Sequence, residues 1–164
     1  MAINEALLAE FDQEIATTRR LLERVPAKDA GWRPHPKSYA LGDLAVHVAT
    51  LPSWVAATMG LPELDLATVA PPAPFTTGES LLAYFDANAQ AGRAALAQAA
   101  DADFGVPWTL KNAGAVIFTL PRAVVLRSFV LSHMIHHRAQ LGVYLRMRDV
   151  PLPPSYGPTA DTAG

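Results

Sequence analysis

The sequence predicts an all-α protein, a four-helix bundle with a long crossover and a short β-hairpin before the last helix. Four segments carry apolar residues at spacings of three and four, which is the period of an amphipathic helix. A proline-rich connection separates the second of these segments from the third, and it is too long for a tight turn between neighbouring helices. The chain has 164 residues, so we expect residues 1–164 to form a single domain.

The first helix is expected over residues 4–24, where acidic residues come early and arginines late, as the helix dipole favours. Glu14 lies at the edge of its apolar face, where a solvated carboxylate is more common than one that supports a buried site. Pro26 ends this helix, and an irregular loop follows. We interpret His35, which lies between two prolines of this loop, as a surface residue, and we expect aromatic residues such as Tyr39 to line a pocket mouth.

The second helix is expected over residues 41–59, with Pro52 bending or restricting it because proline lacks the N–H that the helix needs. The long connection covers residues 60–78. A third helix follows over residues 79–100, and its narrow stripe of small apolar residues predicts close packing against a neighbouring helix.

A β-hairpin is predicted over residues 101–121, because apolar residues alternate on both sides of a turn at residues 112–114. Pro121 then suits the first turn of the last helix, and Thr119 is a candidate cap. The last helix is expected over residues 122–148. A proline-rich tail comes after it and is expected to pack along the outside or to fray at its end.

The last helix carries His133 and His137, whose imidazoles project from the same side one turn apart. This spacing suits two ligands of one metal ion, and His47, on the apolar face of the second helix, is the expected third ligand. The alternative is a core histidine satisfied by hydrogen bonds, which is the more common case for His47 taken alone. Gln140 shares the metal-facing side and is the first candidate to support a ligand, with Glu14 as another possible acceptor or general base.

The composition excludes other kinds of site. Cysteine is absent, which excludes disulfides, a thiolate nucleophile from the chain and cysteine-based metal sites. Lys plus Arg number 13 against 15 for Asp plus Glu, without a basic run, so nucleic-acid binding is not expected. The N-terminal residues show no signal-peptide pattern and no apolar run reaches about 18 residues, so we expect a cytoplasmic protein with no membrane partner.

The last helix is also apolar on the side roughly opposite its histidines, at Val124, Leu131, Ile135 and Gly142. Hydrophobic residues make up 51% of the chain and charged residues 17%, which is apolar for a protein of this size. A helix of a bundle normally leaves its outer side to solvent, so a partner subunit is expected to cover this one. The pattern predicts a homodimer that packs through the last helix.

Three stretches carry a family resemblance: VPAKDAGWRPHPKSYALGDLAVHVATLPSW, FTLPRA and, most specifically, HMIHHRAQLGVYLRMRDVPLPPSYGPTAD. Over nearly all of its length the chain resembles the DinB-like (damage-inducible protein) superfamily of four-helix-bundle metalloenzymes. The resemblance implies a divalent metal held by His47, His133 and His137. His136 falls at the side of the histidine stripe, and we expect it to form a hydrogen bond or lie at the surface. Family members commonly have a Ser or Thr cap where Ala40 stands, so the usual side-chain cap at the start of the second helix is missing here.

The family is similar to S-transferases and isomerases that use low-molecular-weight thiols, and many members are described as metal-dependent hydrolases. Three neutral imidazoles leave an open position on a zinc or nickel ion, as in a catalytic site. Such a position either lowers the pKa of a bound water to about 7 or binds an incoming thiol as thiolate. Since the chain has no cysteine, the thiol would be a cosubstrate. We therefore expect a thiol-dependent S-transferase that acts on small electrophiles, with a hydrolase or a non-catalytic stress-response binding protein as alternatives.

Overall fold

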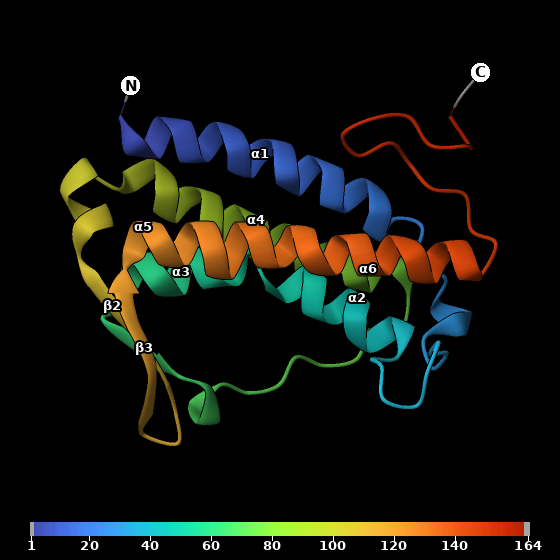
Figure 1. Cartoon of the computed structure of the whole chain (residues 1–164), viewed down its shortest axis with the longest axis horizontal. Helices are drawn as coiled ribbons and strands as arrows, with labels where there is room; N and C mark the ends of the chain where they lie inside the picture. The colour runs from blue at the N-terminus through green and yellow to red at the C-terminus, as the bar shows by residue number, and fades with distance from the viewer. Residues whose placement is uncertain (1, 163–164) are drawn as a thin grey trace.

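The structure is a computed structural model that describes residues 2–162, and it is mainly helical with one small sheet (Figure 1). Its elements follow the predicted order of helices and hairpin, with one additional strand in the crossover. The hairpin begins later than predicted, because residues 101–105 form a short 3-10 helix. They are α1 (Ile3–Leu22), η1 (Ala27–Asp29), α2 (Leu41–Thr50), α3 (Ser53–Gly60), β1 (Glu63–Asp65), η2 (Leu66–Thr68), α4 (Gly78–Gln98), η3 (Asp101–Gly105), β2 (Pro107–Asn112), β3 (Ala115–Pro121), α5 (Arg122–Val125), η4 (Leu126–Ser132) and α6 (His133–Met147).

The long helices pack side by side around clusters of buried apolar side chains. Helix α1 contacts α4 and α6, and α2 contacts the same two helices. One cluster of buried side chains lies around α2 and the C-terminal half of α6, and a second lies around the start of α1, α3 and η4. Figure 1 shows the hairpin at one end of the helices and the C-terminal tail at the other. This frame fixes α2 and α6 relative to each other, which positions the histidines.

The predicted second helix is divided in two. Helix α2 ends before Pro52 and α3 begins after it, as expected from a residue that cannot donate to the helical ladder. Helix α2 nevertheless begins at Leu41, although Ala40 provides no side-chain cap. The backbone N–H of Leu41 instead donates to the carbonyl oxygen of Trp32 at 2.7 Å, so the preceding loop supplies the missing partner.

Helices α3 and α4 approach each other closely at Gly92. A Cβ atom at this position would lie 2.7 Å from the carbonyl oxygen of Pro52 and 3.2 Å from the Cβ of Val55. No larger residue fits there without a shift of backbone. The prediction that small residues of the third helix allow close packing is confirmed.

The crossover contains a strand that the sequence did not predict. Strand β1 pairs in parallel with β2, and β2 pairs antiparallel with β3, with an irregularity between Leu110 and Lys111. Asp65 ends β1, and its carboxylate accepts hydrogen bonds from the backbone of Ala113 at 2.9 Å and of Gly114 at 2.7 Å. The bond from Gly114 is the main reason that the pKa of the Asp65 carboxyl is lowered. Asp65 thus ties the crossover to the hairpin turn.

The last helix is not uniformly α-helical. Between α5 and α6 lies η4, a π-helical segment that ends directly before His133, and π-helical turns occur often at functional sites. The prediction that Thr119 caps this helix is wrong, because Thr119 lies within β3 and its hydroxyl is 2.9 Å from that of Thr109. Pro121 precedes α5 without a side-chain cap.

The tail after α6 folds back over the outside of the helices (Figure 1). The chain reverses at Asp149, which has a φ of 58°, a left-handed conformation that aspartate tolerates better than most residues. Asp161 then fastens the tail by accepting from the backbone of Leu152 at 2.8 Å and from the guanidinium of Arg146. Within residues 2–162, none of the helices combines the length and the apolar character that a bilayer span requires.

Candidate metal centre

Three histidines from two helices meet beside the core. His47 comes from α2, and His133 and His137 come from α6. One nitrogen of each ring lies within 4.8 Å of the other two, and the ring centroids are 4.6 to 5.1 Å apart. His47 is 86 positions from His133 along the chain, and it reaches the pair on α6 because α2 and α6 pack against each other. The structure therefore brings together the three residues that the sequence indicates as ligands.

The distances in this cluster are compatible with a divalent ion. Two nitrogens that each lie about 2.0 to 2.1 Å from a tetrahedral zinc ion are about 3.3 Å apart. The Nε2 atoms of His47 and His133 are 3.3 Å apart. The ligand nitrogen of His137 lies within 4.8 Å of both.

Hydrogen bonds on the far side of two rings orient them. The Nδ1 of His137 lies 2.7 Å from the side-chain oxygen of Gln140, and the Nδ1 of His133 lies 3.3 Å from the carbonyl oxygen of Phe129. Both partners accept, so each ring donates from Nδ1 and its Nε2 keeps a free lone pair. This arrangement leaves Nε2 ready to bind an ion. The partner of His133 is a backbone atom, which no side-chain pattern in the sequence could have indicated.

The imidazoles are held in the neutral form that metals require. Burial, and then the proximity of His137 and His133, lowers the pKa of His47 to about 4. Burial also lowers the pKa values of His133 and His137, although hydrogen bonds to Phe129 and Gln140 oppose this. At neutral pH all three imidazoles are therefore uncharged, which is the protonation state in which histidine binds a metal.

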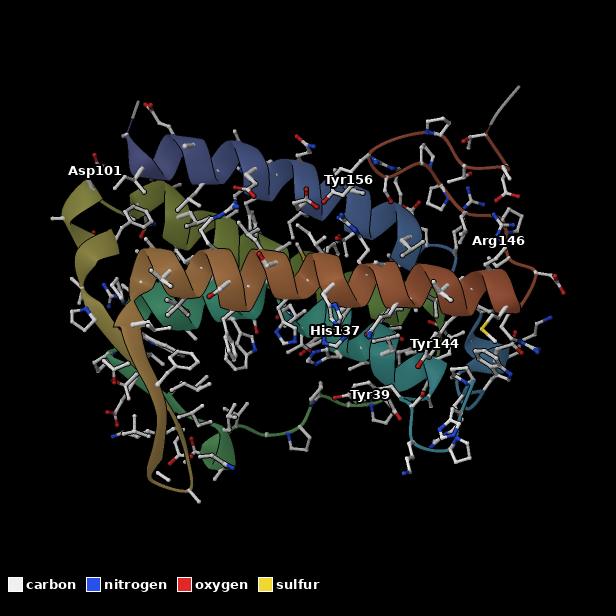
Figure 2. All side chains as sticks on the ribbon, viewed as in Figure 1. Tyr39, Asp101, His137, Tyr144, Arg146 and Tyr156 are labelled. Carbon is white, nitrogen blue, oxygen red and sulfur yellow. The ribbon has the colours of Figure 1, made fainter. Side chains whose placement is uncertain are left out.

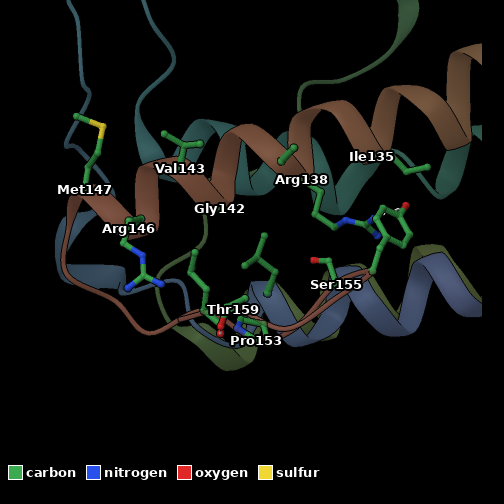
Figure 3. Close-up of a pocket in the computed structure, with 13 residues that line it drawn as sticks. Ile135, Arg138, Gly142, Val143, Arg146, Met147, Pro153, Ser155 and Thr159 are labelled. Atoms are coloured by element: carbon green, nitrogen blue, oxygen red, sulfur yellow. Dashed lines mark hydrogen bonds between the residues drawn. The ribbon is translucent and has the colours of Figure 1, made fainter. Parts of the chain in front are cut away.

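Aromatic rings and a cavity adjoin the cluster. The ring of Tyr39 is stacked on that of His47 with centroids 6.0 Å apart, and the ring of Phe129 packs edge-on to His133 at 5.8 Å. Figure 2 shows Tyr39 and His137 on the same side of α6, facing the crossover. A cavity of about 390 Å³ extends from His47 between α2 and the crossover. Another, of about 460 Å³, lies under the tail on the other side of α6 and is lined by none of the three histidines (Figure 3).

Glu14 belongs to a different cluster. It is only 4% exposed, its carboxylate lies 2.6 Å from Nη1 of Arg138, and the hydroxyl of Tyr156 donates to it at 2.9 Å. Arg138 also donates to the hydroxyl of Thr18 at 3.2 Å. The interpretation of Glu14 as a solvated carboxylate is therefore wrong, because the packing of α1 on α6 supplies a buried guanidinium. Among the described residues, no hydrogen bond links Glu14 to the three histidines.

The remaining histidines lie outside the cluster. His35 is exposed, and its Nδ1 accepts from the backbone N–H of Lys37 at 3.1 Å. His136 is exposed as well, with its ring centroid 4.9 Å from that of His137. Both surface predictions are confirmed.

Fold and site together define a helical protein in which two neighbouring helices present a three-histidine cluster compatible with a divalent metal ion. The chain belongs to the DinB superfamily, whose family model matches residues 10–141. The resemblance seen in the sequence is thus confirmed.

Solved structures of the same family share the fold. A DinB-like protein from Bacillus cereus is 21% identical, with a TM-score of 0.74 over 94% of this chain and 98% of that one. A DinB-like protein from Bacillus subtilis is 16% identical, with a TM-score of 0.72 over 94% of this chain and 99% of that one. No match was found among curated proteins. At these identities the likeness concerns the fold alone.

Proposed function

We propose that this protein is a metal-dependent enzyme, and specifically an S-transferase that joins a low-molecular-weight thiol to a small electrophile. The observation that supports it is the convergence of His47, His133 and His137 in a chain that has no cysteine. A nitrogen-only site of this kind suits zinc or nickel. The sulfur nucleophile must then come from a second substrate.

The residues of the chain hold and orient the ligands. Gln140 fixes the ring of His137, the carbonyl oxygen of Phe129 fixes that of His133, and the stacked ring of Tyr39 limits the movement of His47. A bound divalent ion would act there as a Lewis acid with an open position for water or thiol. Burial keeps the imidazoles neutral, so they bind the ion rather than protons.

Elemental analysis of the purified protein tests the metal site. We expect one divalent ion per chain in the wild type and its loss in His133→Ala. His35→Ala is the matched control, because this histidine is exposed and lies outside the cluster. A wild type without metal, or equal metal content in all three proteins, contradicts the proposal.

The reaction is tested with the metal-loaded protein, a bacterial low-molecular-weight thiol and a chlorinated dinitrobenzene, alongside panels of esters and amides. A thioether product, formed as the C–Cl bond breaks and chloride and the thiol proton are released, supports the transferase if it requires the metal and is lost in His133→Ala. Ester or amide cleavage without thioether formation moves the assignment to a hydrolase. Tight metal uptake with no turnover of any substrate indicates a binding protein.

A further inference from the structure

The cavity beside His47 has more room than metal binding requires. It measures about 390 Å³, and its walls are the outer face of α2 on one side and the crossover residues 69–75 on the other. His47 lines it, so the cavity adjoins the histidine cluster. Its volume lies within the range of about 300 to 1,000 Å³ that is typical of small-molecule sites.

Aromatic and apolar side chains form most of these walls. Tyr39 contributes a ring from the loop before α2, Trp54 contributes one from α3, and Phe75 contributes one from the crossover. Trp54 is itself braced by Phe129, with ring centroids 5.8 Å apart. Such rings favour a flat aromatic ligand, which can stack on one face and meet the edge of another.

The walls contain little that would hold a charged ligand. Among the described residues that line the cavity, Asp43 alone has an ionised side chain. The hydroxyl of Thr50 already forms hydrogen bonds with Val46 and Tyr84. Arg33 and Lys37 line an adjoining depression, which shares Tyr39 and Asp43 with the cavity, but neither cation is among the residues that line the cavity itself. In the metal-free protein, an anionic ligand in this cavity would therefore face the Asp43 carboxylate without a cation among the lining residues.

We propose that this cavity binds the organic electrophile, and that this substrate is an uncharged, flat aromatic molecule whose reactive atom lies at the His47 end. This inference rests on the proposed function, because only a reaction at the histidine cluster makes the neighbouring cavity a substrate site. It assigns a substrate class that the three histidines by themselves leave open.

The test compares two probes of the same shape by calorimetric titration of the full chain, with and without added zinc. Naphthol is uncharged at neutral pH and naphthoate is an anion. We expect naphthol to bind at least about tenfold more tightly than naphthoate to the zinc-free protein, because the carboxylate of the latter must be desolvated beside Asp43 with no metal ion to accept it. Equal binding of the two probes overturns the inference.

Two valine substitutions locate the binding. Val69 lines the cavity and is 49% exposed, whereas Val116 is 60% exposed on the hairpin, so both tolerate a polar side chain. Val69→Asp is expected to weaken naphthol binding about tenfold, while Val116→Asp leaves it unchanged. Asp43→Asn is expected to strengthen naphthoate binding and so reduce the preference. Equal effects of the two aspartate substitutions place the probe elsewhere and overturn the inference.

Zinc uptake, measured in the same titrations, separates this inference from the proposed function. If the protein takes up zinc in the histidine cluster but binds no naphthol, the proposed metal-dependent function stands and the assigned substrate class fails. If the protein binds naphthol in the cavity but takes up no zinc, the assigned ligand class stands and the proposed metal-dependent enzyme function fails.

Discussion

Gln140 shows how a single exposed side chain can matter to a metal site. It lies on the surface, yet its side-chain oxygen holds the Nδ1 of His137 at 2.7 Å. Removing such a partner typically lowers metal affinity by 10 to 100-fold. We expect Gln140→Ala to weaken zinc binding by about tenfold or more in a chelator competition, with unchanged thermal stability of the metal-free protein. Gln90→Ala, at another exposed glutamine, is the control, and equal affinities in the two variants would contradict the role of Gln140.

The three neutral imidazoles make the metal-free protein sensitive to acid. The pKa of His47 is about 4 in the folded chain and near 6.5 in an unfolded one, so the unfolded chain binds more protons between these values. The stability that this histidine contributes is present above pH 6.5 and is lost as the pH falls toward 4. Denaturant unfolding measures the free energy of unfolding at pH 7 and at pH 5. We expect this free energy to fall less between the two pH values in His47→Gln than in the wild type. An equal decrease in the free energy of unfolding in both proteins would rule out His47 as the source of the acid sensitivity.

Glu14 and Arg138 are buried, with exposures of 4% and 3%, so each charge is compensated by the other. Replacing Arg138 by Met leaves an uncompensated buried carboxylate and is expected to cost about 3 to 5 kcal/mol in unfolding free energy. Adding Glu14→Gln to that variant should recover much of the loss. The exposed pair of Asp12 and Arg93 is the control, where Asp12→Asn should cost less than about 1 kcal/mol.

At the scale of elements, Gly92 and Gly142 make a matched pair of helical glycines. A Cβ at Gly92 would meet the carbonyl oxygen of Pro52 at 2.7 Å, whereas a Cβ at Gly142 would meet nothing within 4 Å. We expect Gly92→Ala to destabilise the protein by about 1 to 3 kcal/mol through overpacking. Gly142→Ala should stabilise it by about 0.5 to 1 kcal/mol, because alanine loses less backbone freedom. Thermal unfolding of the two variants measures both, and a stabilised Gly92→Ala would contradict the close contact.

The elements that the sequence predicts correctly are those with a repeating pattern. The helices follow the apolar period, and the hairpin follows its alternation around a Gly-containing turn. Strand β1 has only three residues and pairs with β2 far along the chain, so it leaves no local period. The π-helical η4 also could not be predicted, because the apolar residues of this stretch fit an α-helical period as well.

The candidate site was predictable to the extent that it depends on helix geometry. His133 and His137 are one turn apart on α6, and His47 faces them once α2 packs there. The role of Glu14 could not be predicted, because it depends on which helix packs opposite. The cavity could not be predicted either, since residues 69–75 lie in a proline-rich segment with no period that fixes its path.

At the scale of the whole molecule, the outer side of α6 is partly covered by the chain itself. Leu131 is buried at 3%, and Ile135 and Gly142 lie beneath the tail (Figure 3), so these three do not form a free surface. Val124, the fourth residue of the predicted face, lies in α5 and remains exposed at 44%, and Val143 and Met147 of α6 are exposed at 59% and 54%. The homodimer through this helix stays a prediction and now concerns this smaller surface.

Light scattering at micromolar concentration tests the homodimer. We expect a dimer for the wild type and a monomer for Val143→Asp, because a buried carboxylate without a partner opposes association. Val116→Asp, at an exposed valine of the hairpin, should remain a dimer. A monomeric wild type rejects the prediction.

The crossover that forms the outer wall of the cavity is fastened at both ends. Asp65 ties its beginning to the hairpin turn, and the hydroxyl of Thr77 caps α4 at its end by accepting from the backbone of Ser80. Prolines at positions 71, 72 and 74 further restrict the segment between them. A ligand would therefore bind in a preformed cavity, and little conformational entropy of the crossover would be lost on binding. Relatives with longer or less rigid crossovers would be expected to accept a broader range of guests at lower affinity.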